Sequence, residues 1–187
     1  MIKNKKYHFF KKGNIILLYI FALLLSLSCA ERKKEVQKPD KPNYSEKLIN
    51  VNKLLVDKDA DIIRKYIARR NWQMQTTETG LWFMIVEKGN GKKAQPSKVA
   101  TILYKVYLLD GTLCYSSEKT GPKKFTLGKG GVEGGLEEGV LLLNCGDKAR
   151  FIMPPHLAQG LMGDGNKIPP RSTILYEVEL IQISDSL

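Results

Sequence analysis

The second half of the chain alternates apolar and polar residues with the two-residue period of β-strands. The clearest run is 174–180, in which the even-numbered residues are apolar while Glu177 and Glu179 lie on the other face. A period of two over this length indicates an antiparallel strand that buries one face. Asp110-Gly111 marks a hairpin turn between two such runs. Strands are therefore predicted at 81–86, 99–109, 113–116, 123–127, 148–153 and from 174 onward.

Two other segments carry apolar residues at helical spacing. Between residues 45 and 72 this pattern predicts two short helices, or one helix broken near Asp57. Residues 132–142 follow a glycine-rich turn and carry acidic residues in their first half, as a short helix prefers. Several strands and one short helix predict a single α+β domain, preceded by helical segments. The segment 45–72 is either a packing spacer or a dimerisation arm.

The first 29 residues have the pattern of a bacterial export signal. Lysines without any acidic residue precede an apolar run at 15–25, which is too short for a membrane span. The sequence from Leu25 to Cys29 resembles a lipobox, in which the cysteine becomes the lipid-modified first residue of the mature protein. An ordinary signal peptide with an incidental cysteine, or an uncleaved anchor helix, would also fit. We expect a lipoprotein anchored at Cys29 in the cell envelope, facing the periplasm from the inner or outer membrane.

The basic charge of the chain changes this picture little. The formal charge is +11, from 30 basic and 19 acidic residues, but five of the lysines precede Cys29. Residues 30–44 combine charged residues and proline with almost no apolar side chain, which predicts a disordered tether. Surplus lysine beside an anionic membrane surface is favourable. We therefore expect a membrane partner and no nucleic-acid partner.

Common catalytic and ligand-binding signatures are missing from the mature sequence. His156 is its only histidine, so no serine or cysteine has a histidine base and a zinc site has too few ligands. Residues 128–133 break the dinucleotide fingerprint at its last position. Glu137 and Glu138 are adjacent on the predicted helix and point about 100° apart, so they suit a helix start better than an acid–base pair. We expect no metal, no cofactor and chemistry without a nucleophile.

Two cysteines remain beyond the lipid site. Cys114 and Cys145 could form a disulfide in an oxidising compartment. Both lie in apolar, strand-like surroundings, where cysteine often serves as a small buried hydrophobe. The sequence therefore favours two free thiols.

Residues 79–183 also carry a series of landmarks that resembles the FKBP-type peptidyl-prolyl isomerases. The landmarks, in order, are Tyr104, Asp110-Gly111, Ser116-Ser117, Phe125-Thr126-Leu127-Gly128, Glu137-Glu138-Gly139-Val140, Ile168-Pro169-Pro170 and the strand from Tyr176 to Leu180. This resemblance implies an antiparallel half-barrel sheet wrapped on the short helix. It places a helical preface at 45–78 and an FKBP-like domain at 79–187. It also implies a pocket that grips proline in polypeptide substrates and isomerises the bond before it.

Five pocket positions follow the family. Tyr104, Phe125, Val132 and Ile168 match residues in and around the pocket, and Tyr176 replaces a phenylalanine. The resemblance implies that Phe125, Val132, Ile168 and Tyr176 line one cavity, although they lie far apart in the sequence.

Three further positions depart from the family or contribute only backbone. Glu133 lies where a backbone N–H receives the substrate carbonyl, so its side chain is expected to matter little. Leu136 replaces a tryptophan floor, which is a common variant in bacterial members. Gln159 replaces a tyrosine whose hydroxyl reaches the ligand, and its amide could still donate.

The rim of the pocket departs more strongly. Cys114 and Lys123 stand where aromatic walls are usual, and Tyr115 stands where an aspartate accepts a hydrogen bond. Losing aromatic walls should loosen the pocket and weaken activity.

Two functions remain. One is a peptidyl-prolyl isomerase that assists folding of exported proteins. The other is a non-catalytic FKBP-like module that binds polypeptide or scaffolds an envelope complex. The combination of lipid anchor, helical preface and this domain resembles the lipoprotein isomerases of gliding bacteria.

Overall fold

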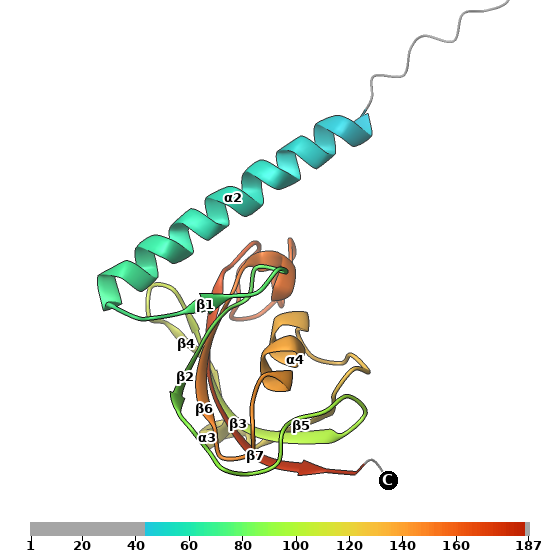
Figure 1. The fold of residues 1–187 in the computed structure, drawn as a ribbon. Coiled ribbons are helices and arrows are strands. Elements are labelled where there is room, and N and C mark those ends of the chain that lie inside the picture. The colour runs from blue at the N-terminus through green and yellow to red at the C-terminus, as the bar shows by residue number, and fades with distance from the viewer. Residues whose placement is uncertain (1–43, 186–187) are drawn as a thin grey trace, which may run out of the picture. The chain divides into compact units, whose positions relative to one another are not determined.

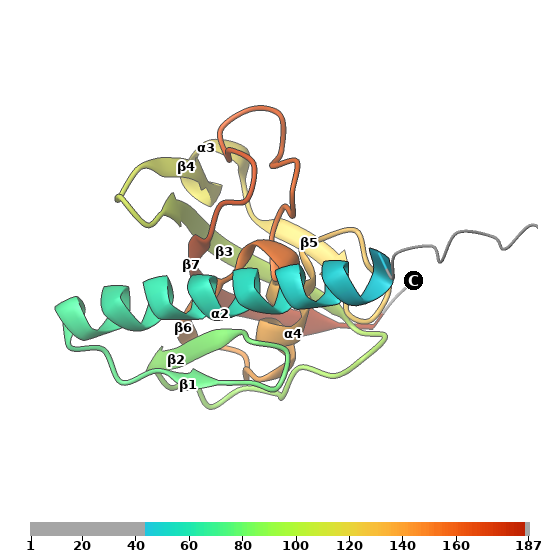
Figure 2. The ribbon, with the colours of Figure 1, turned by 90° about the horizontal axis from the view of Figure 1, so that it is seen from above.

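The computed structural model describes residues 44–185, in which a curved antiparallel sheet carries a helix on each of its faces (Figures 1 and 2). The predicted signal peptide, Cys29 and the tether up to residue 43 lie outside the described residues. Within the described part, none of the helices combines the length and apolar character needed to cross a bilayer. The predicted α+β class is confirmed.

Seven strands of the described residues form the sheet, and all paired strands are antiparallel. Their spatial order is β1-β2-β6-β7-β3-β4, with β5 added on β3. The strands are β1 (Gln75–Thr76), β2 (Trp82–Glu87), β3 (Val99–Leu108), β4 (Leu113–Ser116), β5 (Lys123–Thr126), β6 (Lys148–Met153) and β7 (Ile174–Ser184). Each strand predicted from the alternating pattern is present, because that pattern gives every strand a face to bury. The two-residue β1 was not predicted.

β3 pairs with two strands along the same edge. Val106 pairs with Tyr115 in β4, whereas Ala100 pairs with Phe125 in β5. The four-residue helix α3 (Ser117–Thr120) fills the interval, and the Ser117 hydroxyl accepts a hydrogen bond from the Tyr104 N–H there. Tyr104 therefore lies at the gap between β4 and β5, next to the first residues of β5.

The helix α4 (Gly134–Leu141) lies in the curve of the sheet and buries Leu136 and Val140 completely (Figure 1). Two glycines allow this close approach. A Cβ at Gly139 would stand 2.7 Å from the Phe151 ring, and one at Gly135 would stand 2.9 Å from the Met153 side chain. Because these glycines are spaced four apart, they share the helix face that contacts β6. The absence of side chains at these two glycines lets α4 approach β6 this closely.

The opposite face of the sheet is covered by the helix α2 (Tyr44–Arg70). Its C-terminal half buries Ile63 and Tyr66 against Ile152 of β6 and Leu175 of β7. The helix is continuous, so the alternative of two short helices, or of a break near Asp57, is wrong. No glycine or proline occurs between residues 44 and 70, and an exposed Asp57 costs a helix little.

The helix ends earlier than the predicted preface. Asn71 has φ 52°, in the left-handed region that terminates helices, and its N–H donates to the Ala68 carbonyl. Residues 71–78 are therefore not helical, and the sheet already begins at Gln75. A short apolar satellite core forms where the chain turns, with the Tyr66 and Trp72 rings in edge contact at a centroid distance of 5.9 Å.

Candidate functional site

The residues expected to line the pocket gather on the concave side of the sheet, around α4. Phe125, Ile168 and Tyr176 are buried in the main core cluster, and Val132 packs against it half-buried. The four side chains thus share one core cluster, while their lining of one proline-binding cavity stays a prediction. They come from β5, the loop before α4, the loop before β7 and β7 itself. Tyr104 and Leu136 belong to the same cluster.

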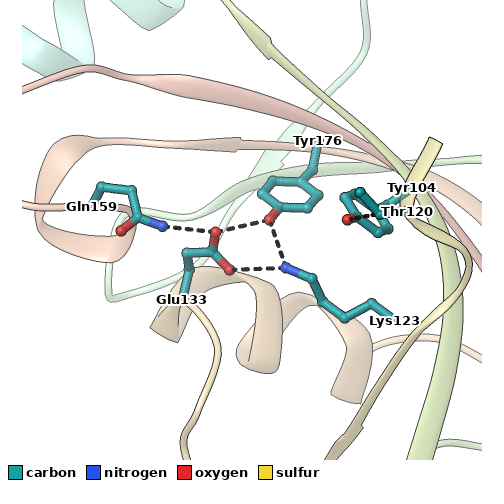
Figure 3. Close-up of polar contacts among 6 residues, drawn as sticks. All are labelled: Tyr104, Thr120, Lys123, Glu133, Gln159 and Tyr176. Atoms are coloured by element: carbon teal, nitrogen blue, oxygen red, sulfur yellow. Dashed lines mark hydrogen bonds and ion pairs between the residues drawn. The ribbon is translucent and has the colours of Figure 1, made fainter. Parts of the chain in front are cut away.

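Two tyrosines form the aromatic part of the site. The Tyr104 and Tyr176 rings lie 6.1 Å apart between centroids, tilted by 34° (Figure 3). Tyr104 Oη is 2.9 Å from the Thr120 hydroxyl. The Tyr176 hydroxyl instead turns to the interior and donates to Glu133 Oε1 at 2.8 Å. The tyrosine that replaces a phenylalanine thus brings a polar group to the bottom of the cluster.

The Glu133 side chain is central to the site, so the expectation that it matters little is wrong. Its carboxylate is only 9 % exposed. Oε1 accepts hydrogen bonds from the Tyr176 hydroxyl and from Gln159 Nε2, the latter at 2.9 Å (Figure 3). Glu133 precedes α4 with φ −57° and ψ 136°, and its side chain does not cap the helix. It is therefore free to reach across to the sheet.

Lys123 completes this cluster from the first position of β5. Its Nζ lies 3.4 Å from the Tyr176 hydroxyl, 3.8 Å from Glu133 Oε2 and 4.9 Å from the Tyr104 ring centroid. Lysine can lay its aliphatic stem along apolar surface while its ammonium meets aromatic faces and acceptors. The lost aromatic wall is therefore replaced by a cation and does not leave a void.

The position of Gln159 differs from its expected role. Its amide does donate, but the acceptor is Glu133 and not a ligand. Lys123, Glu133, Gln159 and Tyr176 thus form one connected polar cluster (Figure 3). The sequence carried a signal for this cluster, because all four side chains can form hydrogen bonds and one is a cation and one an anion.

Burial keeps the Tyr176 hydroxyl protonated. The pKa of Tyr176 is raised far above its usual value, first by burial and then by the neighbouring Glu133 carboxylate. Both effects disfavour a phenolate. The hydroxyl therefore stays protonated over the physiological range and keeps donating to Glu133.

Cys114 does not lie at an open rim. It is only 2 % exposed, and its thiol approaches the Lys167 carbonyl at 3.6 Å. Burial, followed by the charge of Asp164, raises the pKa of the thiol. A protonated, enclosed thiol has a structural role and little reactivity. Cys114 and Cys145 are both free, which confirms the prediction of two free thiols.

Tyr115 holds the loop that closes this side of the site. Its hydroxyl donates to Asp164 Oδ2, while Asp164 Oδ1 accepts from the N–H groups of Asn166 and Ile168 at 2.9 and 2.8 Å. Burial alone would raise the pKa of Asp164, but the Tyr115 and backbone hydrogen bonds hold it below its usual value. The carboxylate expected on β4 is thus supplied by the loop. Sequence reasoning missed Asp164, because it lies among glycines without a periodic pattern.

The two adjacent glutamates of α4 organise the surroundings. Glu137 Oε1 accepts hydrogen bonds from three successive backbone N–H groups, of Gly128, Lys129 and Gly130. Glu138 accepts from the Thr79 hydroxyl at 2.7 Å. They therefore do not act as an acid–base pair. Glu137 instead orders the glycine-rich loop that delivers Val132 and Glu133 to the site.

A separate hollow of about 500 Å³ lies on the other face of the sheet, against β2, β3, β6 and β7. Six of its seven charged side chains form the ion pairs Lys105–Glu118, Lys148–Glu87 and Arg150–Glu177, and the seventh is Glu179. Of the residues expected to bind proline, only Tyr104 is among those that line this hollow. In the described part of the chain, no three His, Cys, Asp or Glu side chains form a group that could hold a metal ion.

Comparisons with known proteins agree with this arrangement. The family model for FKBP-type peptidyl-prolyl cis-trans isomerases matches residues 90–181. The probable FKBP-type peptidyl-prolyl cis-trans isomerase FkpA of Neisseria meningitidis is 38 % identical over 111 residues, which are 59 % of this chain and 40 % of the relative. Peptidyl-prolyl cis-trans isomerase Fkbp12 of Drosophila melanogaster is 41 % identical over 95 residues, covering 50 % of this chain and 82 % of the relative.

Solved structures show the same likeness. The crystal structure of FkpA from Escherichia coli superimposes with a TM-score of 0.59 and 30 % identity, over 77 % of this chain and 70 % of that chain. This chain therefore spans well under half the length of the Neisseria relative, while it covers most of the short Drosophila one.

Proposed function

The chain belongs to the FKBP-type peptidyl-prolyl cis-trans isomerase family, and we propose that its domain isomerises Xaa-Pro bonds in polypeptides outside the cytoplasm. The observation that carries this proposal is that Tyr104, Phe125, Ile168 and Tyr176 all belong to the main core cluster. These residues stand at family pocket positions and come from four separate segments. Their meeting around α4 is what a proline-binding pocket requires.

The chemistry needs no nucleophile. Rotation about the bond before proline is slow because it breaks amide resonance, with a barrier of about 18–20 kcal/mol. Aromatic faces that exclude water, together with a donor for the twisted carbonyl, lower such a barrier. The Glu133 N–H has no hydrogen-bond partner among residues 44–185, so it is available as that donor. Leu136 of α4 is fully buried and belongs to the same core cluster.

A second function is favoured by one specific observation. Lys123 and Glu133 place a cation and a carboxylate beside the two tyrosine rings, where an isomerase pocket would be apolar. Charged groups interact with water and work against desolvation of the imide. This polar cluster supports a slower enzyme, or a module that binds polypeptide in the envelope without catalysis.

Refolding of a proline-limited protein separates these two functions. With the full chain purified in detergent, an isomerase shortens the slow refolding phase in proportion to its concentration. A binding module leaves that phase unchanged or lengthens it, because it holds unfolded chains. An unchanged slow phase at equimolar protein, together with measurable polypeptide binding, would replace the enzyme with the binding module.

We also propose that the protein is a lipid-anchored component of the cell envelope, on the basis of the lipobox-like sequence ending at Cys29. Changing Cys29→Ser should abolish incorporation of labelled fatty acid and yield no mature lipoprotein, because the cysteine is the residue that carries the acyl chains. Mass spectrometry of the mature N-terminus is the measurement. Cleavage at another residue with an unmodified Cys29 would contradict the anchor.

The N-terminal half of α2 supports a dimer as a further part of this proposal. Leu48 and Val51 are 62 % and 53 % exposed, at helical spacing on the same helix whose other half is packed on the sheet. Leu48→Glu with Val51→Glu should convert a dimer to a monomer, since charges cannot be buried in an apolar contact. Sedimentation in detergent measures this, with Lys53→Glu as the charge-matched control. A wild-type monomer would rule out the dimer.

A further inference from the structure

The two partners of the Lys123–Glu133 ion pair differ in their exposure to solvent. The Glu133 carboxylate is 9 % exposed, whereas the Lys123 side chain is 28 % exposed. The Glu133 carboxylate already accepts two hydrogen bonds at Oε1, from Tyr176 and Gln159. The positive end of the pair is therefore its more exposed end, and the Lys123 ammonium is the group that a ligand can reach.

Lys123 has donors to spare. An ammonium can donate three hydrogen bonds. Among the described residues, Lys123 Nζ makes one hydrogen bond, to the Tyr176 hydroxyl at a long 3.4 Å, and its 3.8 Å separation from Glu133 Oε2 is an ion pair without a hydrogen bond. The remaining contacts are to ring faces, at 4.9 Å from the Tyr104 centroid and 5.8 Å from the Tyr176 centroid. A ligand oxygen can take the unused donors without displacing Glu133.

A second lysine borders the same region. Lys167 Nζ lies 5.3 Å from the Tyr115 ring centroid and donates to the Cys114 carbonyl at 3.0 Å. The nearby carboxylate of Asp164 is engaged by Tyr115 and by backbone N–H groups. Both acidic groups of the site are thus held by internal donors, whereas both lysines keep donors free. The unused hydrogen-bond donors that a ligand oxygen can take are therefore those of the lysine ammonium groups.

We propose that Lys123 is a specificity-determining residue that selects Xaa-Pro segments with an aspartate or glutamate next to the proline. The inference rests on the proposed isomerase function and assigns its substrate class. The substrate carboxylate accepts a charge-assisted hydrogen bond from Nζ at the edge of the tyrosine rings, where water is partly excluded. A lysine or arginine beside the proline would meet a like charge and be disfavoured.

Two peptide series test this inference, with the full chain in detergent. One series places Glu, Gln, Leu or Lys before proline and the other places the same residues after it. Cis–trans exchange and peptide binding are both measured by NMR, at low and at high salt. The expected result is a preference for Glu over Gln of about 5- to 10-fold in kcat/KM and in affinity, in at least one series. The preference should shrink at high salt, because partly exposed charges are screened.

Matched variants assign the preference to Lys123. Lys123→Met keeps the aliphatic stem and should bring the Glu-to-Gln ratio to about 1. Lys124→Met removes an exposed charge one residue away and should leave the ratio unchanged. Equal use of Glu and Gln peptides by the wild type, or a ratio that survives Lys123→Met, would overturn the inference. If the protein accelerates exchange of no peptide, the proposed isomerase function is overturned. The Glu-to-Gln ratio of the binding affinities would then test the role of Lys123 separately.

Discussion

Replacing Glu133 by leucine should destabilise the protein by about 2–3 kcal/mol, although leucine is the more apolar residue. The Tyr176 hydroxyl and the Gln159 amide would lose their shared acceptor, and a buried donor left unsatisfied costs about 1–3 kcal/mol. Chemical denaturation measures this loss. Glu138→Leu in α4 is the control, because its partner is the exposed Thr79 hydroxyl, and it should cost less than about 0.5 kcal/mol.

A double-mutant cycle identifies the cause of that loss. In a Tyr176→Phe background the hydroxyl is absent, so Glu133→Leu should cost about 1.5–3 kcal/mol less than in the wild type, the range for a hydrogen bond to a charged group. Additive losses in the cycle would show that Glu133 and Tyr176 do not interact. The polar cluster would then not be the feature that organises this site.

Truncating Phe125 to alanine should cause the largest loss of stability, about 3–5 kcal/mol. The ring is 8 % exposed and belongs to the main core cluster, on a strand that pairs with Ala100 of β3. Removing it leaves a cavity between β5 and α4 that the rigid surroundings cannot fill. Denaturation with urea is the measurement, and Lys124→Ala on the same strand is the control. A loss below about 1.5 kcal/mol would place Phe125 on an open cleft and not in a core.

The fold follows from the sequence because its signals are local and repeated. Alternation in 174–180 and the Asp110-Gly111 turn predict strands and a hairpin without knowledge of their partners. The continuity of α2 was predicted less well. One unbroken helix replaces the two short helices, or the break near Asp57, that the pattern predicted. The second buried face of β7, at Leu175, was not foreseen, because it is created by the distant Ile63 and Tyr66 of α2.

The candidate site was predicted in its members but not in its contacts. The resemblance placed Lys123, Glu133, Gln159 and Tyr176 at pocket positions one by one. Each was assessed against the family residue that it replaces, and not against the other three. Their hydrogen bonds join residues that are between 26 and 53 positions apart, and the Lys123–Glu133 ion pair spans 10 positions. Such long-range complementarity becomes visible only when the chain is folded.

The most direct test of the account is the exchange between cis and trans forms of an Xaa-Pro tetrapeptide. Uncatalysed exchange takes tens to hundreds of seconds at 25 °C. With the full chain in catalytic amounts, the account predicts that NMR exchange becomes faster in proportion to protein concentration, with Glu-Pro or Pro-Glu peptides gaining most. If exchange of every peptide stays at the uncatalysed rate while the protein is folded and binds peptide, the domain is a binding module and not an isomerase.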